Sequence, residues 1–83
     1  MLVNLSNTNL LVTLPSGNRA VYSVQPQHMP REDIPGSREW PMLWGEQLAV
    51  ELSGRWYKTG GKEEITDPKT IALLERCPGV DHA

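Results

Sequence analysis

Few side chains in this sequence have the types and spacing that catalysis or phosphate binding requires. Gly60-Gly61-Lys62 is similar to the end of a phosphate-binding loop. That motif also needs a glycine five residues before its Gly-Lys pair and a Ser or Thr after the lysine, where this chain has Trp56 and Glu63. We therefore predict a tight turn between strands at these glycines.

The groups that bind metals or act as nucleophiles are equally sparse. The two histidines, His28 and His82, have no second ligand at metal-site spacing, and we expect both to be exposed to solvent. Cys77 is the one cysteine, so no internal disulfide and no CxxC-type zinc site is available. As a nucleophile it would need an activating base such as His28. Its place on the apolar face of a helix predicts a small core residue instead.

Two pairs of adjacent acids, Glu32-Asp33 and Glu63-Glu64, are the remaining candidates for catalysis. Paired-carboxylate chemistry needs two acids in one pocket whose surroundings separate their pKa values. Neighbours in an exposed loop or edge strand point in different directions and stay solvated. We therefore predict that the protein is not an enzyme and binds no cofactor and no metal.

Composition narrows the class of protein further. The 83 residues predict a single domain, 1–83, and the net charge of −2 argues against nucleic-acid binding, which usually needs a basic excess. A lone thiol fits a reducing compartment, and the first fourteen residues lack the pattern of a signal peptide. These features predict a cytoplasmic protein that does not enter a membrane.

Residues 2–24 have the pattern of an N-terminal β-hairpin region. In order, they contain an apolar run at 2–5, turn formers at 6–9, a β-rich run at 10–14, a turn at Pro15–Asn18 and a second β-rich run at 19–24. Two such runs around a short Pro- and Gly-containing loop indicate a hairpin. A symmetric loop would place Val12 opposite Val21, and Leu11 opposite Tyr22.

Residues 25–45 form a proline-rich segment, with four of the seven prolines. Proline removes a backbone donor and restricts the residue before it, so neither a long helix nor a central strand fits. We predict an extended loop, with one short helix that starts at Pro41. A loop of this length in a compact domain is often functional.

Residues 46–65 form a second β region, although 46–53 also fits a helix. With period two, Leu48, Val50 and Leu52 share a face that continues to Trp56, and Ser53-Gly54 is a two-residue turn. With helical spacing, Trp44, Leu48 and Leu52 form a row and Gly54 caps it. The Trp, Tyr and Thr after Gly54 favour strands, which places Trp56 in the core. Residues 62–65 follow as a short edge strand.

Residues 67–77 predict a C-terminal helix. Asp67 is placed to cap it, Pro68 occupies its first position, and Pro78-Gly79 ends it. Ile71, Leu74 and Cys77 recur along one apolar stripe. The whole chain therefore predicts a small α+β domain: mostly antiparallel strands in two hairpins, with a C-terminal helix packed against them.

A binding function would most plausibly use the proline-rich segment and its aromatic end. Tryptophan and arginine are favoured interface anchors, and a stiff loop loses little entropy on docking. Either Trp40 and Trp44 fold back as a lid over the sheet, with Trp44 the more buried, or they face a partner. The predicted partner-binding residues are Arg31, Ile34, Arg38, Trp40 and Trp44.

The two ends of the chain resemble small structural and accessory proteins of tailed phages. The resemblance is carried by Val3–Asn7 with Leu14–Gly17, and by Glu64–Pro68 leading to Ile71, Leu74 and Pro78–Val80. It covers about a third of the chain. It implies a phage or prophage product that works in a host cytoplasm, and it carries over no functional residue.

Two functions follow as hypotheses. The first is a protein–protein interaction module without enzymatic activity, phage-encoded, which is either a virion or assembly component or an inhibitor of a host protein. Its partner is then a host or virion protein, or a second copy of the chain. The alternative is a domain that binds single-stranded nucleic acid through the aromatic and basic hairpin Arg55–Lys58.

Overall fold

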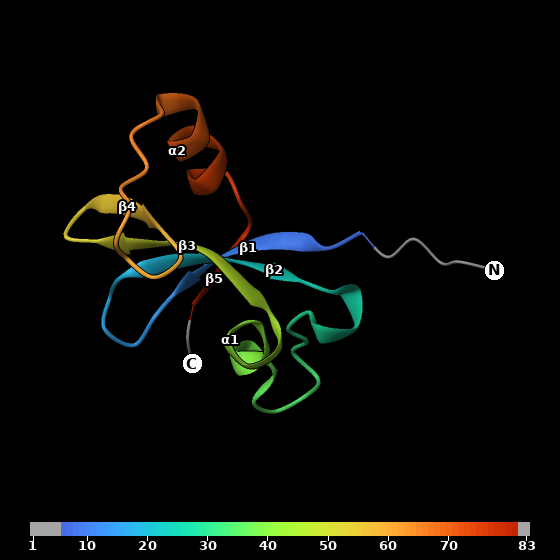
Figure 1. The fold of residues 1–83 in the computed structure, drawn as a ribbon. Coiled ribbons are helices and arrows are strands. Elements are labelled where there is room, and N and C mark those ends of the chain that lie inside the picture. The colour runs from blue at the N-terminus through green and yellow to red at the C-terminus, as the bar shows by residue number, and fades with distance from the viewer. Residues whose placement is uncertain (1–5, 82–83) are drawn as a thin grey trace.

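The protein folds around one five-stranded sheet with a helical layer on each face (Figure 1). The computed structural model describes residues 6–81, without the side chain of Asp81, so the predicted apolar run at 2–5 lies outside them. The strands are β1 (Thr8–Thr13), β2 (Arg19–Val24), β3 (Glu46–Leu52), β4 (Arg55–Lys58) and β5 (Gly79–Asp81). The helices are α1 (Trp40–Trp44) and α2 (Pro68–Glu75), with 3₁₀ turns η1 (Pro26–His28) and η2 (Ser37–Glu39). The predicted α+β class is confirmed.

The strand order across the sheet is β4-β3-β2-β1-β5. All neighbours are antiparallel except β5, which runs parallel to β1. β5 follows α2 directly, where the sequence predicted only the end of the helix. Pro78-Gly79-Val80 has no strand pattern of its own, and its partner β1 lies at the other end of the chain, so no local signal marks it.

The hairpin of β1 and β2 is confirmed, but its predicted register is wrong by one residue. Leu11 pairs with Val21 and Leu10 with Tyr22. The loop is not symmetric about Pro15–Asn18, because the Leu14 N–H donates to the Asn18 carbonyl at 2.8 Å. Gly17 completes the turn at φ 91° and donates to the Leu14 carbonyl. A three-residue loop that ends in a left-handed glycine is a common hairpin connection, and it shifts the pairing.

The strands predicted over 46–59 are confirmed, and a helix there is excluded. Ser53 and Gly54 both have positive φ, at 52° and 78°, as the mirror-image two-residue turn requires. This turn pairs Glu51 with Trp56, so Trp56 shares a face with Glu51. The predicted common face of Trp56 with Leu48, Val50 and Leu52 is therefore wrong, because period two does not continue through a two-residue turn.

A register shift lies between β2 and β3. Val21 pairs with Ala49 but Tyr22 pairs with Gln47, which leaves Leu48 as the extra residue of a bulge. Leu48 is 39% exposed as a result. The predicted edge strand at 62–65 is reduced to one bridge between Tyr57 and Glu64 beside β4.

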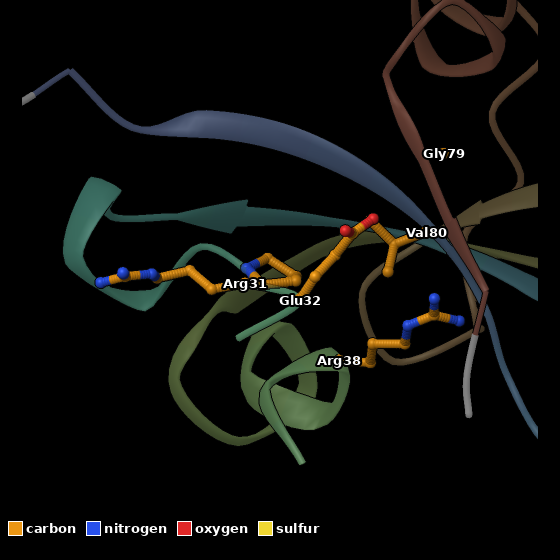
Figure 2. Close-up of a pocket in the computed structure, with 6 residues that line it drawn as sticks. Arg31, Glu32, Arg38, Gly79 and Val80 are labelled. Carbon is orange, nitrogen blue, oxygen red and sulfur yellow. The ribbon is translucent and has the colours of Figure 1, made fainter. Parts of the chain in front are cut away.

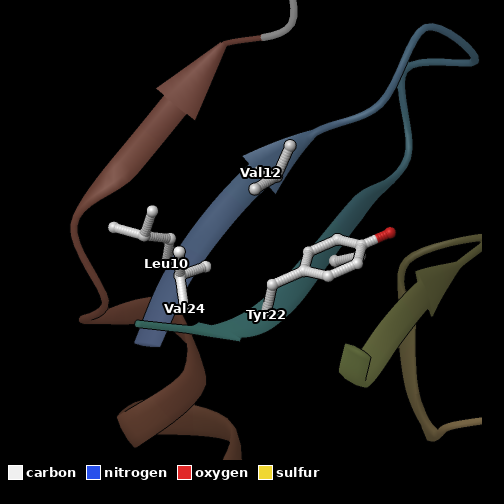
Figure 3. Packing of buried hydrophobic residues seen from close by; sticks show 5 residues of the cluster. Leu10, Val12, Tyr22 and Val24 are labelled. Carbon is white, nitrogen blue, oxygen red and sulfur yellow. The ribbon is translucent and has the colours of Figure 1, made fainter. Parts of the chain in front are cut away.

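The face of the sheet that α1 covers holds the first apolar cluster, part of which appears in Figure 3. Leu10, Val12, Ala20, Tyr22 and Val24 form its buried centre. Met29 and Met42 of the proline-rich segment pack onto this centre, and Val80 of β5 joins it. The segment is therefore the cover of this face and not a mere connection.

The opposite face is covered by α2. Val21, Ala49 and Trp56 are buried there, against the predicted stripe of Ile71, Leu74 and Cys77. Trp56 is 3% exposed, which confirms it as a core residue. None of the helices within residues 6–81 has the length and apolar character needed to span a membrane.

Asp67 caps α2 as predicted. Its carboxylate accepts from the Lys69 N–H at 3.3 Å and from the Thr70 hydroxyl at 2.8 Å. These hydrogen bonds, that of Thr70 first, hold the pKa of Asp67 below its ordinary value. The cap fixes where the helix begins, and so which side chains meet the sheet.

One charged cluster joins β2, β3 and α2. Arg19 makes two hydrogen bonds to the Glu51 carboxylate, at 2.7 and 2.8 Å, and a third to Glu75 at 3.2 Å. Its guanidinium also lies 5.6 Å from the centre of the Trp56 ring. The hydrogen bond from Arg19 lowers the pKa of Glu51, although partial burial opposes this. The cluster binds the helical layer to the sheet.

Replacing Glu51 by Gln is expected to lower the free energy of unfolding by about 1–2 kcal/mol at neutral pH, because a two-bonded charged pair is lost. The pKa of Glu51 is depressed in the folded state, so its contribution is present above the ordinary value of 4.5 and disappears as the pH falls through the folded pKa. In urea denaturation, the difference in free energy of unfolding between wild type and variant should therefore shrink as the pH falls below 4.5.

Glu63→Gln is the matched control, since the Lys58–Glu63 pair is exposed and should contribute less than about 0.5 kcal/mol. If the difference in free energy of unfolding between wild type and Glu51→Gln does not change with pH, the charged pair of Arg19 and Glu51 is not its source.

Candidate functional site

The proline-rich segment 25–45 is coiled into successive turns, so the prediction of an extended loop is wrong. His28 donates to the Gln25 carbonyl, Ile34 to that of Arg31, and Ser37 to that of Ile34. Gly36 takes the left-handed conformation at φ 79° within the turn from Ile34 to Ser37. Proline excludes long regular elements but permits such short turns, and turns bring the segment back over the sheet.

Ser37 closes the middle of this segment. It is 1% exposed, its hydroxyl donates to the Arg31 carbonyl, and its oxygen accepts from the Arg31 N–H at 2.8 Å. Both bonds are made to backbone groups of Arg31, six residues earlier in the chain. The N–H and carbonyl of Arg31 therefore have hydrogen-bond partners without being part of a strand or helix. The serine therefore fixes the loop that carries the predicted residues Arg31, Ile34 and Arg38.

The short helix α1 confirms the predicted helix, with Pro41 at its second position. Pro41 is buried and Met42 packs on the apolar cluster, so this side of α1 faces the sheet. Gly45 ends the helix, and its N–H donates to the Pro41 carbonyl at 3.0 Å. A Cβ at Gly45 would lie 2.4 Å from the same oxygen, so glycine is required for this close approach.

The two tryptophans of the segment differ in burial, in the reverse of the predicted order. Trp40 is half-buried, whereas Trp44 is 62% exposed. Leu43, beside it, is 65% exposed. Because Pro41 and Met42 face the sheet, the turn of the helix directs Leu43 and Trp44 elsewhere. Leu43 was not predicted as a site residue, although a helical projection from Pro41 places it away from the sheet.

Trp44 is held on one side by His28. The two rings stack at 5.4 Å between centroids and 22° between planes. His28 is half-buried, and its Nδ1 is shielded from solvent without a hydrogen-bond partner within residues 6–81. The prediction of a solvent-exposed His28 is therefore wrong. A π-stack between η1 and α1 limits the positions that the exposed Trp44 ring can take.

Arg31 and Arg38 line two adjoining hollows on this side of the molecule. One, of about 310 Å³, lies between the loop and β5 and is lined by Pro30, Arg31, Glu32, Arg38, Gly79 and Val80 (Figure 2). The other, of about 370 Å³, also includes Ile34. Glu32, Gly79 and Val80 were not predicted as site residues, because β5 itself was not. Trp40 and Trp44 line neither hollow.

The groups considered for catalysis remain apart. Within the described part of the chain, no cluster of three His, Cys, Asp or Glu side chains is placed to hold a metal ion. The Cys77 thiol donates to the Leu73 carbonyl at 3.4 Å, and burial raises its pKa. Gly60 and Gly61, at φ 100° and 71°, form the predicted tight turn.

The hairpin Arg55–Lys58, predicted as an alternative nucleic-acid surface, has its tryptophan buried. Trp56 is buried under α2, and Arg19 lies over its ring. The two cations of the hairpin face acids, with Arg55 3.8 Å from Glu64 and Lys58 3.2 Å from Glu63. Stacking on bases needs exposed aromatic faces, and burial of Trp56 leaves the half-buried Tyr57 as the one aromatic ring that this hairpin could offer.

Comparison with known proteins found no matching family model, no matching curated protein and no matching solved structure.

Replacing Ser37 by Ala is expected to loosen the loop from Arg31 to Ser37 and to lower the free energy of unfolding by about 1 kcal/mol, because two partly buried backbone groups of Arg31 lose their partner. Amide hydrogen exchange should show faster exchange at Arg31, whose N–H bonds to this side chain. Ser16→Ala is the control, because Ser16 is exposed and only accepts a 3.4 Å bond from Asn18. Unchanged exchange at Arg31 would show that the serine does not fix the loop.

Proposed function

We propose that the protein is a non-enzymatic protein-binding module that docks through α1. The observation that carries this proposal is the exposure of Leu43 and Trp44 as neighbours on a helix whose other side is buried. Tryptophan supplies large contact area with little rotamer entropy to lose, and it is enriched among the residues that dominate binding energy.

The rigidity of the surrounding segment supports this role. Pro41 and Met42 anchor α1 to the sheet, Gly45 ends it in close contact with Pro41, and His28 stacks on the Trp44 ring. Side chains that are already held in place lose less freedom on binding, so more of the contact energy appears as affinity. The segment therefore has two roles. Met29 and Met42 cover the core, while Leu43 and Trp44 face outward and are available to a partner.

The resemblance of the chain ends to tailed-phage proteins supports a phage-encoded module, either a virion or assembly component or an inhibitor of a host protein. The two roles differ in the identity of the partner. An inhibitor forms a stoichiometric complex with a host protein, whereas a virion component assembles with phage proteins or with itself. Pull-down from a host lysate, combined with light scattering on the purified protein, separates these outcomes.

Trp44→Ala and Leu43→Ala are each expected to weaken binding to the isolated partner by about tenfold or more, because each removes a central apolar contact worth at least 1–2 kcal/mol. The fold should be unaffected, since both side chains are mostly exposed. Titration calorimetry with the partner measures the affinity, and thermal unfolding checks the fold.

Leu73→Ala is the matched control for Leu43→Ala. Leu73 is 64% exposed on α2, on the opposite face of the sheet, and its removal should leave affinity unchanged. Equal affinity of the wild type and both α1 variants would refute docking through α1, and equal losses in all three variants would indicate a non-specific effect.

A further inference from the structure

We propose that His28 is a pH-sensitive switch on the Trp44 ring: neutral His28 holds the ring in its stacked position, and protonated His28 releases it. The proposal rests on the proposed function, because it describes how docking through α1 is regulated. Three features carry it: the stack between the two rings, the shielded Nδ1 of His28, and the absence of an acid paired with His28 within residues 6–81.

The stack joins two segments whose backbones are held in place independently of it. Met29, next to His28, packs on the first apolar cluster, and so does Met42 of α1. Gly45 ends α1 in close contact with Pro41. The two rings can therefore separate by side-chain motion alone, while both segments stay folded over the sheet.

The Nδ1 atom of His28 is the part of the stack that is sensitive to charge. It is shielded from solvent and has no hydrogen-bond partner within residues 6–81. Neutral imidazole carries one proton, which can stay on Nε2 and leave Nδ1 as an unprotonated acceptor. Imidazolium carries a proton on both nitrogens, so the shielded Nδ1 becomes a charged donor without an acceptor or water. A buried charged group without a partner costs far more than an unpaired neutral acceptor.

No acidic side chain is placed to compensate that charge. Neither η1 nor α1 contains an acid, and within residues 6–81 no carboxylate forms an ion pair with His28. Arg31, the charged residue that follows η1 in the chain, pairs with Asp33 at 2.8 Å.

The elements packed against α1 carry six titratable groups: Arg38 and Glu39 on η2, Glu46 and Glu51 on β3, and Arg19 and Tyr22 on β2. Arg19 and Glu51 pair with each other beside Trp56, on the face that α2 covers. The Tyr22 hydroxyl accepts from Gln47. Since none of the six bonds to the shielded Nδ1 of His28, a charge on the stacked ring stays uncompensated.

The attraction between a cation and an aromatic face opposes release but does not outweigh it. A stacked imidazolium would gain a cation–π contact with Trp44, which is weak at sites open to solvent, and Trp44 is 62% exposed. The Nδ1–H reaches water only if the His28 ring moves out of its place. The ring then leaves its near-parallel position over Trp44, so protonation and stacking exclude one another.

The direction of the pH dependence follows from the chemistry of histidine. A histidine side chain changes its charge between about pH 5 and about pH 8, so the stack is present at the upper end of this range and is lost as the pH falls through it. A released Trp44 ring regains rotamer freedom, which docking must remove again. Acidification therefore weakens docking through α1.

Nuclear magnetic resonance of the protein alone tests the switch without a partner. The three tryptophans give three indole N–H signals, and Trp44→Phe assigns that of Trp44. As the pH falls from about 7.5 to about 5.5, nuclear Overhauser contacts between the His28 and Trp44 rings should disappear and the Trp44 signal should shift. The signal of the buried Trp56 should stay in place, which provides a control within the same sample.

Two histidine variants locate the titrating group. His28→Phe keeps an aromatic ring beside Trp44 without a titrating nitrogen, so its Trp44 signal should not respond to pH. His82→Gln removes the second histidine of the sequence and should respond like the wild type. The proposal is overturned if ring contacts in the wild type persist at about pH 5.5, because protonated His28 then stays stacked or turns over in place. It is also overturned if His28→Phe keeps the response or His82→Gln abolishes it.

Titration calorimetry with the isolated partner connects the switch to docking. Between about pH 7.5 and about pH 5.5, the wild type should lose about three- to tenfold more affinity than His28→Phe, which reports any titration of the partner itself. His28→Ala lacks the stack at every pH and should already bind about three- to tenfold more weakly than the wild type at about pH 7.5.

Trp44→Ala separates failure of the switch from failure of the proposed function. If Trp44→Ala binds weakly while the wild type and His28→Phe lose affinity equally on acidification, the switch alone is refuted. If Trp44→Ala binds as tightly as the wild type, docking through α1 is refuted, and its regulation by His28 with it.

Discussion

The central strand β2 needs cover on both of its faces, and the rest of the structure depends on meeting that need. Ala20, Tyr22 and Val24 are buried on one side and Val21 on the other. A strand in this position is apolar on nearly every residue, unlike the alternating strand of a sheet with one wet face. Two layers are therefore required, and the longest helix within residues 6–81, α2, has only eight residues and covers one face.

The proline-rich segment is the second layer. Its methionines cover the sheet opposite α2, and Ser37 together with Gly45 keeps the turns close enough to do so. A segment that covers a face with so few residues cannot bury all of its own apolar side chains. Leu43 and Trp44 remain outside for this reason. The same constraint thus produces a structural cover and an exposed apolar pair within one segment.

Local signals in the sequence were sufficient for some elements and not for others. The Asp67-Pro68 cap and the Ser53-Gly54 turn depend on neighbouring residues alone, and both were predicted correctly. The register of β1 against β2 depends on whether the loop has four residues, Pro15–Asn18, or three, Pro15–Gly17. Composition does not distinguish the two. The bulge at Leu48 and the bridge at Glu64 result from pairing between strands, so periodicity within one strand did not indicate them.

The candidate site shows the same division. Trp, Arg and Pro content pointed to the proline-rich segment, where Arg31, Ile34 and Arg38 line hollows. Trp44 was predicted to be the more buried of the two tryptophans, but the position of α1 over the core leaves it exposed. Gly79 and Val80 were not predicted because they reach the site only through long-range pairing with β1. Side-chain type therefore located the surface, and tertiary contacts determined which residues are exposed on it.

The pairing of β5 with β1 also has a consequence for biosynthesis. Leu11 leaves the ribosome before Gly79, so the β1 edge stays open until β2, β3, β4 and α2 have been made. The face that buries Val21 and Trp56 lacks its cover until α2, which follows β1 to β4 in the chain, has been made. Contacts between distant residues form slowly and leave apolar surface exposed in the meantime. We therefore expect this domain to complete its sheet and cover both faces only after α2 and β5 have left the ribosome.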